Sequence, residues 1–552
     1  MKSFLLLLLI FKIFSVSGIA FSQPYTQMWS ATYNGPSNQM DEPACMVVGP
    51  DGYIYVAGTS TTNPMSGAAD FVTIKYSPGG TVIWTASYSG IINPTLSFDF
   101  ARAITVDSLG NVYVTGYSWG DSSYSDILTL KYSSIGILQW IRRLNGTGNW
   151  YDEGRCIVTD RTGIYVTGTS YDGNTPNMRS IRYTLSGVEL WDWGVIINGF
   201  GSVPMKSKLD KFSNLYVLGT GWSQDQYHNY VLIKISQFGD SRWVKAYNGP
   251  ANRNDDASDM AIDKKGNVYI TGSSTGSGTD LDYATVKYDS SGNQLWIRRY
   301  NGPVNGIDIA TAITVDTSGN SYVTGYSVGL NTYYDYATIK YNANGDSLWV
   351  RRYDSGPSGK GDDMATSISW DKQSSGIYVT GMSSGPGNSG TDYTTIHYSD
   401  SGAQLWLARY NGSGNGNDSA CSIIVQDPWN IIVTGSSTGI SSDKDIVTIK
   451  YSQPVGINPI GNSVPEKFSL QQNYPNPFNP ITNINYDIPF ADYISIKVFD
   501  ILGNEVETLV NEWQSAGSYS VTFDASNKST GIYFYKLLTS DITETKKMMV
   551  VK

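Results

Sequence analysis

Aspartate residues recur at two places in a pattern that repeats along the chain, and their carboxylates are the first candidates for chemistry. One set precedes a first apolar strand (Asp41, Asp99, Asp152, Asp255, Asp308, Asp363 and Asp418) and the other precedes a third strand (Asp70, Asp126, Asp282, Asp335, Asp392 and Asp445). A carboxylate at a loop-to-strand junction can accept hydrogen bonds from free backbone N–H groups, and repetition favours this structural role. Calcium binding is the alternative, but the D-x-[DN]-x-[DN]-G spacing that directs several oxygens to one ion is missing. We therefore predict no cofactor and no metal, and keep calcium as the less supported alternative.

Two of the repeated units break this symmetry, and the residues around the breaks form the candidate ligand-binding site. Asn177 and Asn229 replace the second Asp in units three and four, and Ser202 replaces the first Asp in unit four. The candidate site residues are Trp150, Tyr151, Tyr171, Asp172, Asn174, Trp222, Asp225, Tyr227 and His228. Aromatic planes beside hydrogen-bonding groups suit sugar rings or extended peptides. Drift in degenerate repeats is the alternative explanation.

Catalytic chemistry has little support in the sequence, and we predict no catalytic residue. The two histidines are His228 and His397, and His397 replaces the Lys of a repeated strand, so we expect it to be structural. No Cys/His metal cluster, phosphate-cradling loop or nucleophile elbow occurs in the sequence. Paired carboxylates for glycoside hydrolysis stay open, because one face of the predicted fold collects many Asp residues whose separations the sequence does not give.

Two further features of the repeats have structural interpretations. Cys45, Cys156 and Cys421 stand at similar places in three units, which favours small buried apolar side chains over disulfides. Lys206 and Asp259 occupy matching positions where other units carry Ala, Cys or Ser. We expect these two to pair across units four and five.

The strands that position these residues repeat eight times. Each unit has an apolar strand ending in Gly, a D-x-x-T-[IVL]-K-Y-like strand and a strand that carries Trp. The Trp residues are Trp29, Trp84, Trp140, Trp191, Trp243, Trp296, Trp349 and Trp406. Four antiparallel strands make one blade, and the nearly continuous apolar inner strands are typical of sheets covered on both faces. Residues 23–452 are therefore predicted to form an all-β, eight-bladed β-propeller.

The ends of the repeat region predict how the ring closes. The chain enters with a Trp strand, Gln27 to Tyr33, that has no blade before it, and it leaves after a third strand at Tyr451. Placing the Trp29 strand as the outer strand of the eighth blade removes the open edges. Short turns join strands one to two and three to four, so the longer connections lie on the opposite face, where we expect the binding site.

Several segments of these units resemble the SBBP-type β-propeller repeat of exported bacterial proteins. The resemblance rests on Ala312 to Asp316, Gly319 to Gly325 and Asp335 to Tyr341, and it extends over roughly residues 25 to 452. It implies a propeller and no particular activity, since one fold hosts many functions.

A different module follows the repeats. Residues 453–465 are predicted to be a linker, and the alternating strands of residues 466–552 predict a small β-sandwich. Four motifs in it, Pro475 to Phe478, Asp500 to Val506, Gly531 to Tyr535 and Lys546 to Lys552, closely resemble the type A C-terminal sorting domain of the type IX (Por) secretion system. The resemblance implies Sec export, passage across a Gram-negative outer membrane by the type IX machinery, and then surface attachment or release.

Composition and the N-terminus are consistent with an exported protein. Residues 1–22 combine Lys2, an apolar stretch and small residues, which predicts a cleaved signal peptide, and no later segment is apolar enough to span a bilayer. The net charge of −10 gives no field that attracts nucleic acid. We expect a non-catalytic secreted or outer-membrane surface protein that binds carbohydrate or another macromolecule, such as a protein. A propeller glycoside hydrolase or lyase and a purely structural envelope protein are the alternatives.

Overall fold

The chain divides into two compact units in a computed structural model. One unit is Thr26–Ser452 and the other contains Gln453–Lys552. The structure describes residues 25–63, 67–90, 98–120, 124–173, 175–195, 201–222, 227–355, 361–372, 376–385, 390–427, 430–452, 458–459, 465, 467–489, 492–514, 517–539 and 542–552. The signal peptide predicted over residues 1–22 and most of the linker predicted over residues 453–465 lie outside this range.

The first unit is built from four-stranded antiparallel sheets, which we number in chain order. Sheet 1 holds β2 (Asp41–Val48), β3 (Ile54–Asn63), β4 (Ala68–Tyr76) and β5 (Val82–Tyr88). Sheet 2 holds β6 (Asp99–Val106), β7 (Val112–Trp119), β8 (Ser125–Tyr132) and β9 (Leu138–Leu144). Sheet 3 holds β10 (Glu153–Thr159), β11 (Gly163–Asp172), β12 (Thr175–Thr184) and β13 (Glu189–Val195). Sheet 4 holds β14 (Ser202–Leu209), β15 (Leu215–Trp222), β16 (His228–Ile235) and β17 (Ser241–Tyr247).

Four more sheets follow in the same order of strands, except in the last. Sheet 5 holds β18 (Asp255–Ile262), β19 (Val268–Thr275), β20 (Leu281–Tyr288) and β21 (Gln294–Tyr300). Sheet 6 holds β22 (Asp308–Val315), β23 (Ser321–Val328), β24 (Tyr334–Tyr341) and β25 (Ser347–Tyr353). Sheet 7 holds β26 (Asp363–Trp370), β27 (Ile377–Ser384), β28 (Thr391–Tyr398) and β29 (Gln404–Tyr410). Sheet 8 holds β30 (Ser419–Asp427), β31 (Asn430–Thr438), β32 (Lys444–Ser452) and the N-terminal β1 (Thr26–Tyr33), which pairs with β32.

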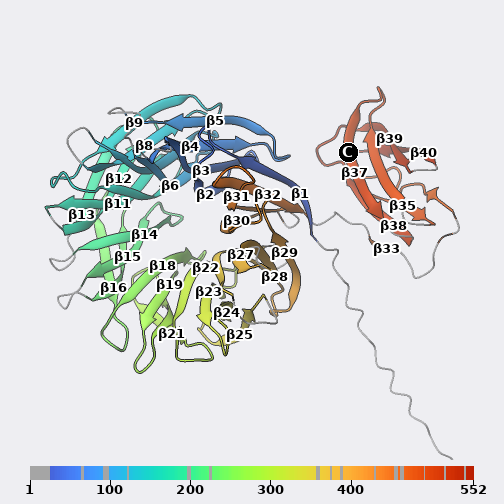
Figure 1. The fold of residues 1–552 in the computed structure, drawn as a ribbon. Coiled ribbons are helices and arrows are strands. Elements are labelled where there is room, and N and C mark those ends of the chain that lie inside the picture. Colours follow the sequence, from blue (N-terminus) through green and yellow to red (C-terminus); the bar gives the residue numbers. More distant parts are fainter. Residues whose placement is uncertain are drawn as a thin grey trace, which may run out of the picture. The chain divides into compact units, whose positions relative to one another are not determined.

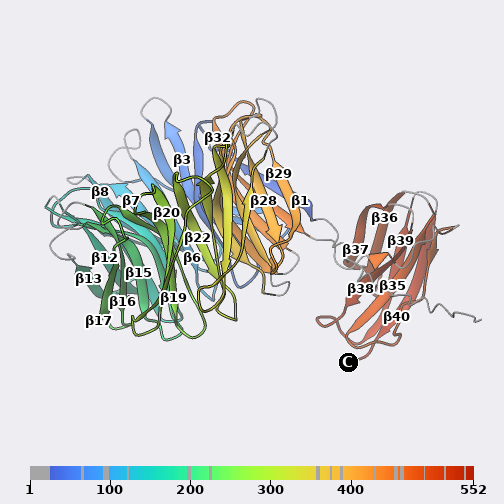
Figure 2. The ribbon, with the colours of Figure 1, turned by 90° about the horizontal axis from the view of Figure 1, so that it is seen from below.

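The sheets lie side by side around a common centre, so the predicted all-β, propeller-like fold is confirmed (Figure 1). Figure 2 shows the same unit turned by 90°, with strands such as β20, β22 and β28 running from one face of the unit to the other. No helix that could cross a membrane occurs in the described part of the chain.

Apolar contacts between neighbouring sheets hold this arrangement together. Val112, Tyr113 and Val114 of β7 are fully buried, although alternate side chains of a strand point to opposite faces. Tyr113 packs in one cluster with Ile157 and Ile164 of sheet 3. Both faces of the inner strands are therefore covered, as the apolar runs in the sequence predict.

The first strand of each sheet carries a register shift two residues after its Asp position. In β6 the shift lies between Ala101 and Ala103, and in β10 it lies between Gly154 and Cys156. The partner strand must come very close here, since a Cβ on Gly116 would lie 1.9 Å from the Phe100 carbonyl oxygen. Only glycine fits this approach. A bulge also changes the direction of the skipped side chain, which is Arg102 in β6 and Arg155 in β10.

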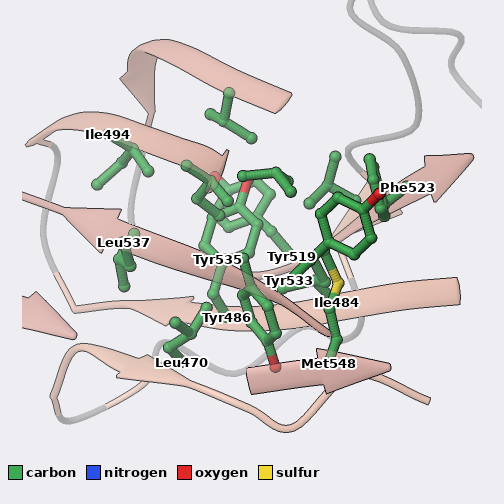
Figure 3. Close-up of a cluster of buried hydrophobic side chains, with 14 of the residues drawn as sticks. Leu470, Ile484, Tyr486, Ile494, Tyr519, Phe523, Tyr533, Tyr535, Leu537 and Met548 are labelled. Atoms are coloured by element: carbon green, nitrogen blue, oxygen red, sulfur yellow. The ribbon is translucent and has the colours of Figure 1, made fainter. Parts of the chain in front are cut away.

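The second unit contains two four-stranded sheets in its described residues. One has the order β33 (Asn458–Pro459), β38 (Gly517–Asp524), β35 (Ile481–Ile488), β34 (Ser469–Leu470). The other has the order β37 (Glu505–Gln514), β36 (Asp492–Phe499), β39 (Gly531–Leu538), β40 (Thr543–Val550). Residues of both sheets, among them Ile484, Tyr486, Tyr535 and Leu537, share one buried cluster (Figure 3).

Candidate ligand-binding site

The Asp residues before the first strands have the structural role that the sequence predicts. All seven are fully buried. The Oδ2 atom of Asp308 accepts a hydrogen bond from the Gly302 N–H at 2.6 Å, and Asp418 accepts bonds from Gly412 N–H and Thr438 N–H at 2.6 and 2.9 Å. Burial raises the pKa of Asp308, while the hydrogen bonds from Ser327 and Gly302 oppose that rise. These carboxylates therefore order the loops and do not reach a ligand.

Most Asp residues before the third strands pair with an arginine of the fourth strand. The distances are 2.9 Å for Asp126 and Arg143, 2.8 Å for Asp282 and Arg299, 2.7 Å for Asp335 and Arg352, and 3.0 Å for Asp392 and Arg409. Ion pairing makes these Asp residues part of the sheet scaffold as well.

One group of three carboxylates in the described residues is close enough to hold a metal ion. Oxygens of Asp335, Asp354 and Asp363 lie within 4.8 Å of one another. Asp335 is already paired with Arg352, and Asp363 accepts backbone hydrogen bonds from Ser355 and Ser384. A cation here would compete with the guanidinium, so this chemistry fits calcium poorly.

A cavity of about 580 Å³ lies where sheets 2, 3 and 4 meet. Its lining residues come from strand ends and from the longer connections, on the face where the sequence places the site. They are Phe98, Phe100, Arg102, Tyr117, Trp119, Ser125, Tyr151, Glu153, Arg155, Thr169, Tyr171 and Val203. We call this the aromatic cavity. Its volume lies within the range of ordinary small-ligand pockets.

Aromatic pairs make up the wall and rim of the aromatic cavity. Phe100 and Tyr117 stack with ring centroids 5.1 Å apart, and Phe98 lies 5.1 Å from Trp119. At the rim, Tyr124 lies 4.7 Å from Tyr151 and 5.6 Å from Trp150. Tyr151 is 47% exposed and Trp119 is 36% exposed, so both rings are accessible. Exposed, mutually braced rings form planes on which the apolar face of a sugar can stack.

Charged groups form a compact network in the same cavity. Arg102 Nε lies 2.6 Å from Glu153 Oε1, and Arg155 Nη2 lies 2.8 Å from Glu153 Oε2. Arg102 also lies over the Tyr117 ring, 5.4 Å from its centroid. Arg102 and Arg155 occupy the same bulge position in adjacent sheets. Two guanidinium groups share one carboxylate, which leaves N–H donors and one net positive charge for a ligand.

Part of the predicted site is brought together here. Tyr151 and Tyr171 line the aromatic cavity, and Trp150 stacks at its rim. Asp172 lines a second cavity of about 380 Å³ that shares Tyr171, and it accepts a hydrogen bond from Thr147 Oγ1 at 2.8 Å. Asn174 and Asp225 lie outside the described residues.

The other predicted residues form a separate group. Trp222 meets His228 edge to face at 5.3 Å, and His228 Nδ1 lies 2.6 Å from Asp256 Oδ1 of sheet 5. Neither residue lines the aromatic cavity or the cavity beside it. Tyr227 directly precedes His228 and is 40% exposed. The structure therefore separates the predicted residues of units three and four.

The prediction missed the contribution of sheet 2. Phe98, Phe100, Arg102, Tyr117 and Trp119 all line the aromatic cavity. Sheet 2 keeps both recurrent Asp residues, Asp99 and Asp126, so it shows no break at the positions that guided the prediction. A signal did exist at the bulge, where Arg102 and Arg155 stand in place of the Thr311 and Thr366 of sheets 6 and 7.

The other structural expectations concern Lys206 and the cysteines. Lys206 Nζ lies 3.5 Å from Asp259 Oδ1, so the predicted pair is confirmed. The Asp259 carboxylate raises the pKa of Lys206. All three cysteines are free, as predicted, and burial raises the pKa of Cys45 and Cys156 to about 11 and that of Cys421 to about 12. At neutral pH these groups are therefore thiols and not thiolates.

Comparison with protein families identifies both parts of the chain. Residues 472–552 match the Secretion system C-terminal sorting domain, and residues 97–122, 235–278 and 295–330 match the SBBP β-propeller repeat. The chain thus carries SBBP repeats and a Por secretion tail, as the sequence motifs indicate. The tail indicates type IX secretion to the cell surface or extracellular space, and it implies an interaction with the type IX machinery. The propeller fold agrees with a binding or structural role.

Individual relatives are distant. An uncharacterised WD repeat-containing protein of Acanthamoeba polyphaga mimivirus is 24% identical over 351 residues, which is 50% of this chain and 24% of that protein. The chain thus matches about a quarter of the length of this curated relative. The WD40 domain of SCAP from fission yeast has a TM-score of 0.41 at 7% identity, covering 77% of this chain and 98% of that one. A protein of unknown function from Dyadobacter fermentans has a TM-score of 0.34 at 10% identity, covering 64% and 93%.

Proposed function

We propose that this secreted protein binds polysaccharide through the aromatic cavity, without catalysis. The observation that carries the proposal is the grouping of Tyr151 and Trp119 with the Arg102–Glu153–Arg155 network in one accessible cavity. Aromatic planes supply stacking, and the polar network supplies hydrogen bonds to hydroxyl groups. A protein ligand that presents an extended segment is the other occupant this chemistry admits.

The arrangement of the sheets supports a finer account of the architecture. We infer that the eight sheets are the blades of one ring, and that β1 closes it as the outer strand of the eighth blade. Trp29 is the register partner of Lys450 in β32. Met46 and Ile54 of sheet 1 pack in one cluster with Ile432 and Ile446 of sheet 8. Cys421 Sγ of sheet 8 lies 3.8 Å from the Pro43 carbonyl oxygen of sheet 1.

The same interpretation extends to processing and location. We infer removal of residues 1–22 as a signal peptide, a linker over residues 453–465, and delivery to the outer surface of a Gram-negative bacterium. The support is the sorting domain at residues 472–552 together with the charge and apolar pattern at the N-terminus.

The two alternative functions have less support. A glycoside hydrolase or lyase needs carboxylates that reach the sugar, whereas the seven Asp residues before the first strands are fully buried and Glu153 is held by two arginines. A purely structural envelope role gives no reason for the accessible aromatic cavity.

Binding and turnover can be measured on the same sample. The full chain, labelled with a fluorophore, is applied to an array of bacterial and plant polysaccharides, and bound polysaccharides are then incubated with unlabelled protein. We expect binding to a subset of the array with no new reducing ends or unsaturated products. Product formation would favour the enzyme, and an empty array would favour the structural role.

A further inference from the structure

A further cavity, of about 540 Å³, lies between sheets 4 and 5. It is lined by the turn from β14 to β15, the turn from β18 to β19 and the turn after β20. The short turns lie at the opposite strand ends from the connections that line the aromatic cavity, so the two cavities belong to different faces of the unit. Lys211, Phe212, Lys234, Lys264 and Lys265 are among its lining residues, and we call it the lysine cavity.

The local charge of the lysine cavity is opposite to that of the whole chain. Four lysines and two carboxylates, Asp210 and Asp263, line it, so its formal charge is positive while the chain carries −10. In the part of the chain that the structure describes, no ion pair joins Lys211, Lys264 or Lys265 to an acidic group within 4.0 Å. All three side chains are exposed. Their charges are free to meet a ligand.

Both carboxylates of the cavity are engaged by their own turns. Asp210 Oδ1 accepts hydrogen bonds from the Phe212 and Asn214 N–H groups, each at 2.9 Å. Asp263 Oδ1 accepts bonds from Lys265 N–H at 2.8 Å and Asn267 N–H at 2.9 Å. Lys234, 3.8 Å from Asp210 Oδ2, donates to the Ser290 carbonyl at 3.0 Å. Turn-bound carboxylates hold the loop conformation, and the lysines project from it.

The fold does not require lysines at these turn positions. In sheets 2 and 6 the equivalent turns contain Ser108 with Leu109 and Thr317 with Ser318. Asp107 accepts hydrogen bonds from Leu109 and Asn111 N–H groups at 2.9 Å, as Asp210 does in its turn. The same turn therefore forms with uncharged residues at these positions. The lysines add positive charge that the turn does not need for its hydrogen bonds.

An exposed aromatic ring lies beside the lysines of the cavity. Phe212 is 66% exposed, and Lys211 Nζ lies 5.0 Å from the centre of its ring. A ring beside several ammonium groups fits a molecule with an apolar face and anionic substituents. A sugar that carries sulfate or carboxylate groups has both features, and a cavity of this size holds a small number of sugar units.

We propose that the lysine cavity binds an acidic polysaccharide through its sulfate or carboxylate groups, as a site separate from the aromatic cavity. The ammonium groups of Lys211, Lys264 and Lys265 bind the anions, and Phe212 stacks on a sugar face. Sulfated and carboxylated sugars share this chemistry, and the test distinguishes them.

The test uses the full chain and three polymers of the same size class: dextran sulfate, polygalacturonate and neutral dextran. Affinity is measured by calorimetry at low and high salt for the native chain, for Lys211→Ala/Lys264→Ala/Lys265→Ala, and for Lys211→Arg/Lys264→Arg/Lys265→Arg. A charge-matched control is Lys372→Ala/Lys467→Ala/Lys547→Ala, because these lysines are exposed and lie outside the cavity. The unfolding temperature of each variant shows that it is folded.

We expect at least one polyanion, and not neutral dextran, to bind the native chain, with weaker binding at high salt. The alanine triple variant should lose at least tenfold in affinity, whereas the arginine variant and the control should keep it. The polymer that binds identifies the anionic group. Failure of both polyanions to bind, or an equal loss in the control, would overturn the proposal, and a loss in Tyr151→Ala alone would assign the polyanion to the aromatic cavity instead.

Discussion

The indole N–H of Trp29 donates a hydrogen bond to the carbonyl oxygen of Pro78 at 3.1 Å, which links sheet 8 to a turn of sheet 1. The same bond joins other neighbouring sheets, as in Trp84 to Ser134 at 3.1 Å and Trp296 to Ala343 at 3.2 Å. Lys450 also donates to Pro78 at 3.3 Å, as Lys287 does to Ala343 at 2.9 Å. Sheet 8 therefore contacts sheet 1 through the same Trp and Lys hydrogen bonds that join other neighbouring sheets.

The Trp29 contact predicts the effect of a single methyl group in the turn of sheet 1. Gly80 has a φ of +86°, and a Cβ there would lie 2.5 Å from the Trp29 ring. Gly80→Ala should lower the free energy of unfolding by about 1 to 3 kcal/mol, from the left-handed backbone and the clash together. Urea denaturation followed by tryptophan fluorescence measures this. Gly79→Ala is the control, because its Cβ meets Ser77 Oγ only at 3.7 Å, and equal stability of both variants would contradict the contact.

Removing one buried Asp tests the structural role of the recurring carboxylates. Asp418→Ala leaves the N–H groups of Gly412 and Thr438 without their acceptor, so we expect a loss of about 2 to 4 kcal/mol in unfolding free energy. The exposed Asp443 gives the matched control, Asp443→Ala, which should change stability by less than about 0.5 kcal/mol. Calorimetric unfolding of both variants makes the comparison. A native-like Asp418→Ala protein would show that these bonds do not stabilise the fold.

The buried His397 predicts a pH dependence of stability. Burial lowers the pKa of His397 to about 4, and the Asp371 carboxylate opposes this only in part. Between pH 6.5 and 4 the unfolded chain binds a proton at this residue and the folded chain does not, so stability falls as the pH falls. Relative to His397→Gln, the native chain should lose about 2 to 3 kcal/mol between pH 7.5 and pH 4.5. Unfolding curves at both pH values test this, and a pH-independent difference between the two proteins would refute it.

The sorting domain predicts where a truncated chain accumulates. A chain that ends at residue 471 lacks the matched segment 472–552 and should stay in the periplasm, while the full chain reaches the surface or the medium. Immunoblots of cell fractions from a type IX-competent host measure this. The same truncation in a host without the machinery should make no difference, and surface delivery of the truncated chain would contradict the role of the domain.

Much of the fold was predictable because each repeated unit uses the same local contacts. The Trp, Gly and Asp positions recur since every blade needs the same inter-sheet bond, close approach and loop acceptor, as Trp84, Gly116 and Asp99 illustrate. The strand that contains Trp29 could be placed beside the strand that ends at Tyr451 because the repeat pattern left it without a unit of its own, and the two strands are paired in the structure. The order and pairing of the strands can therefore be derived from the periodicity of the sequence.

The candidate site was only partly predictable, because it depends on which strand ends of sheets 2, 3 and 4 meet at the cavity. Breaks in the repeat pointed to Tyr151 and Tyr171, which belong to the unit where the breaks begin and which line the aromatic cavity. They missed Phe100, Arg102 and Trp119, whose sheet keeps the regular pattern and contributes through a bulge. They also joined Trp222 and His228 to the site, although this pair is held by Asp256 of sheet 5. Side-chain direction at a bulge is a three-dimensional property that the repeat pattern does not show.

Polysaccharide binding by the Tyr151→Ala/Trp119→Ala variant is the decisive measurement for the aromatic cavity. The probe is the polysaccharide that gives the strongest signal on the array. Its affinity is measured by calorimetry for the native chain, for this variant, and for Tyr333→Ala, whose ring is 60% exposed in the connection between β23 and β24. If the aromatic cavity binds polysaccharide, the double variant loses at least tenfold in affinity with an unchanged unfolding temperature, and Tyr333→Ala binds as the native chain does. Equal binding by all three proteins would contradict binding at this cavity.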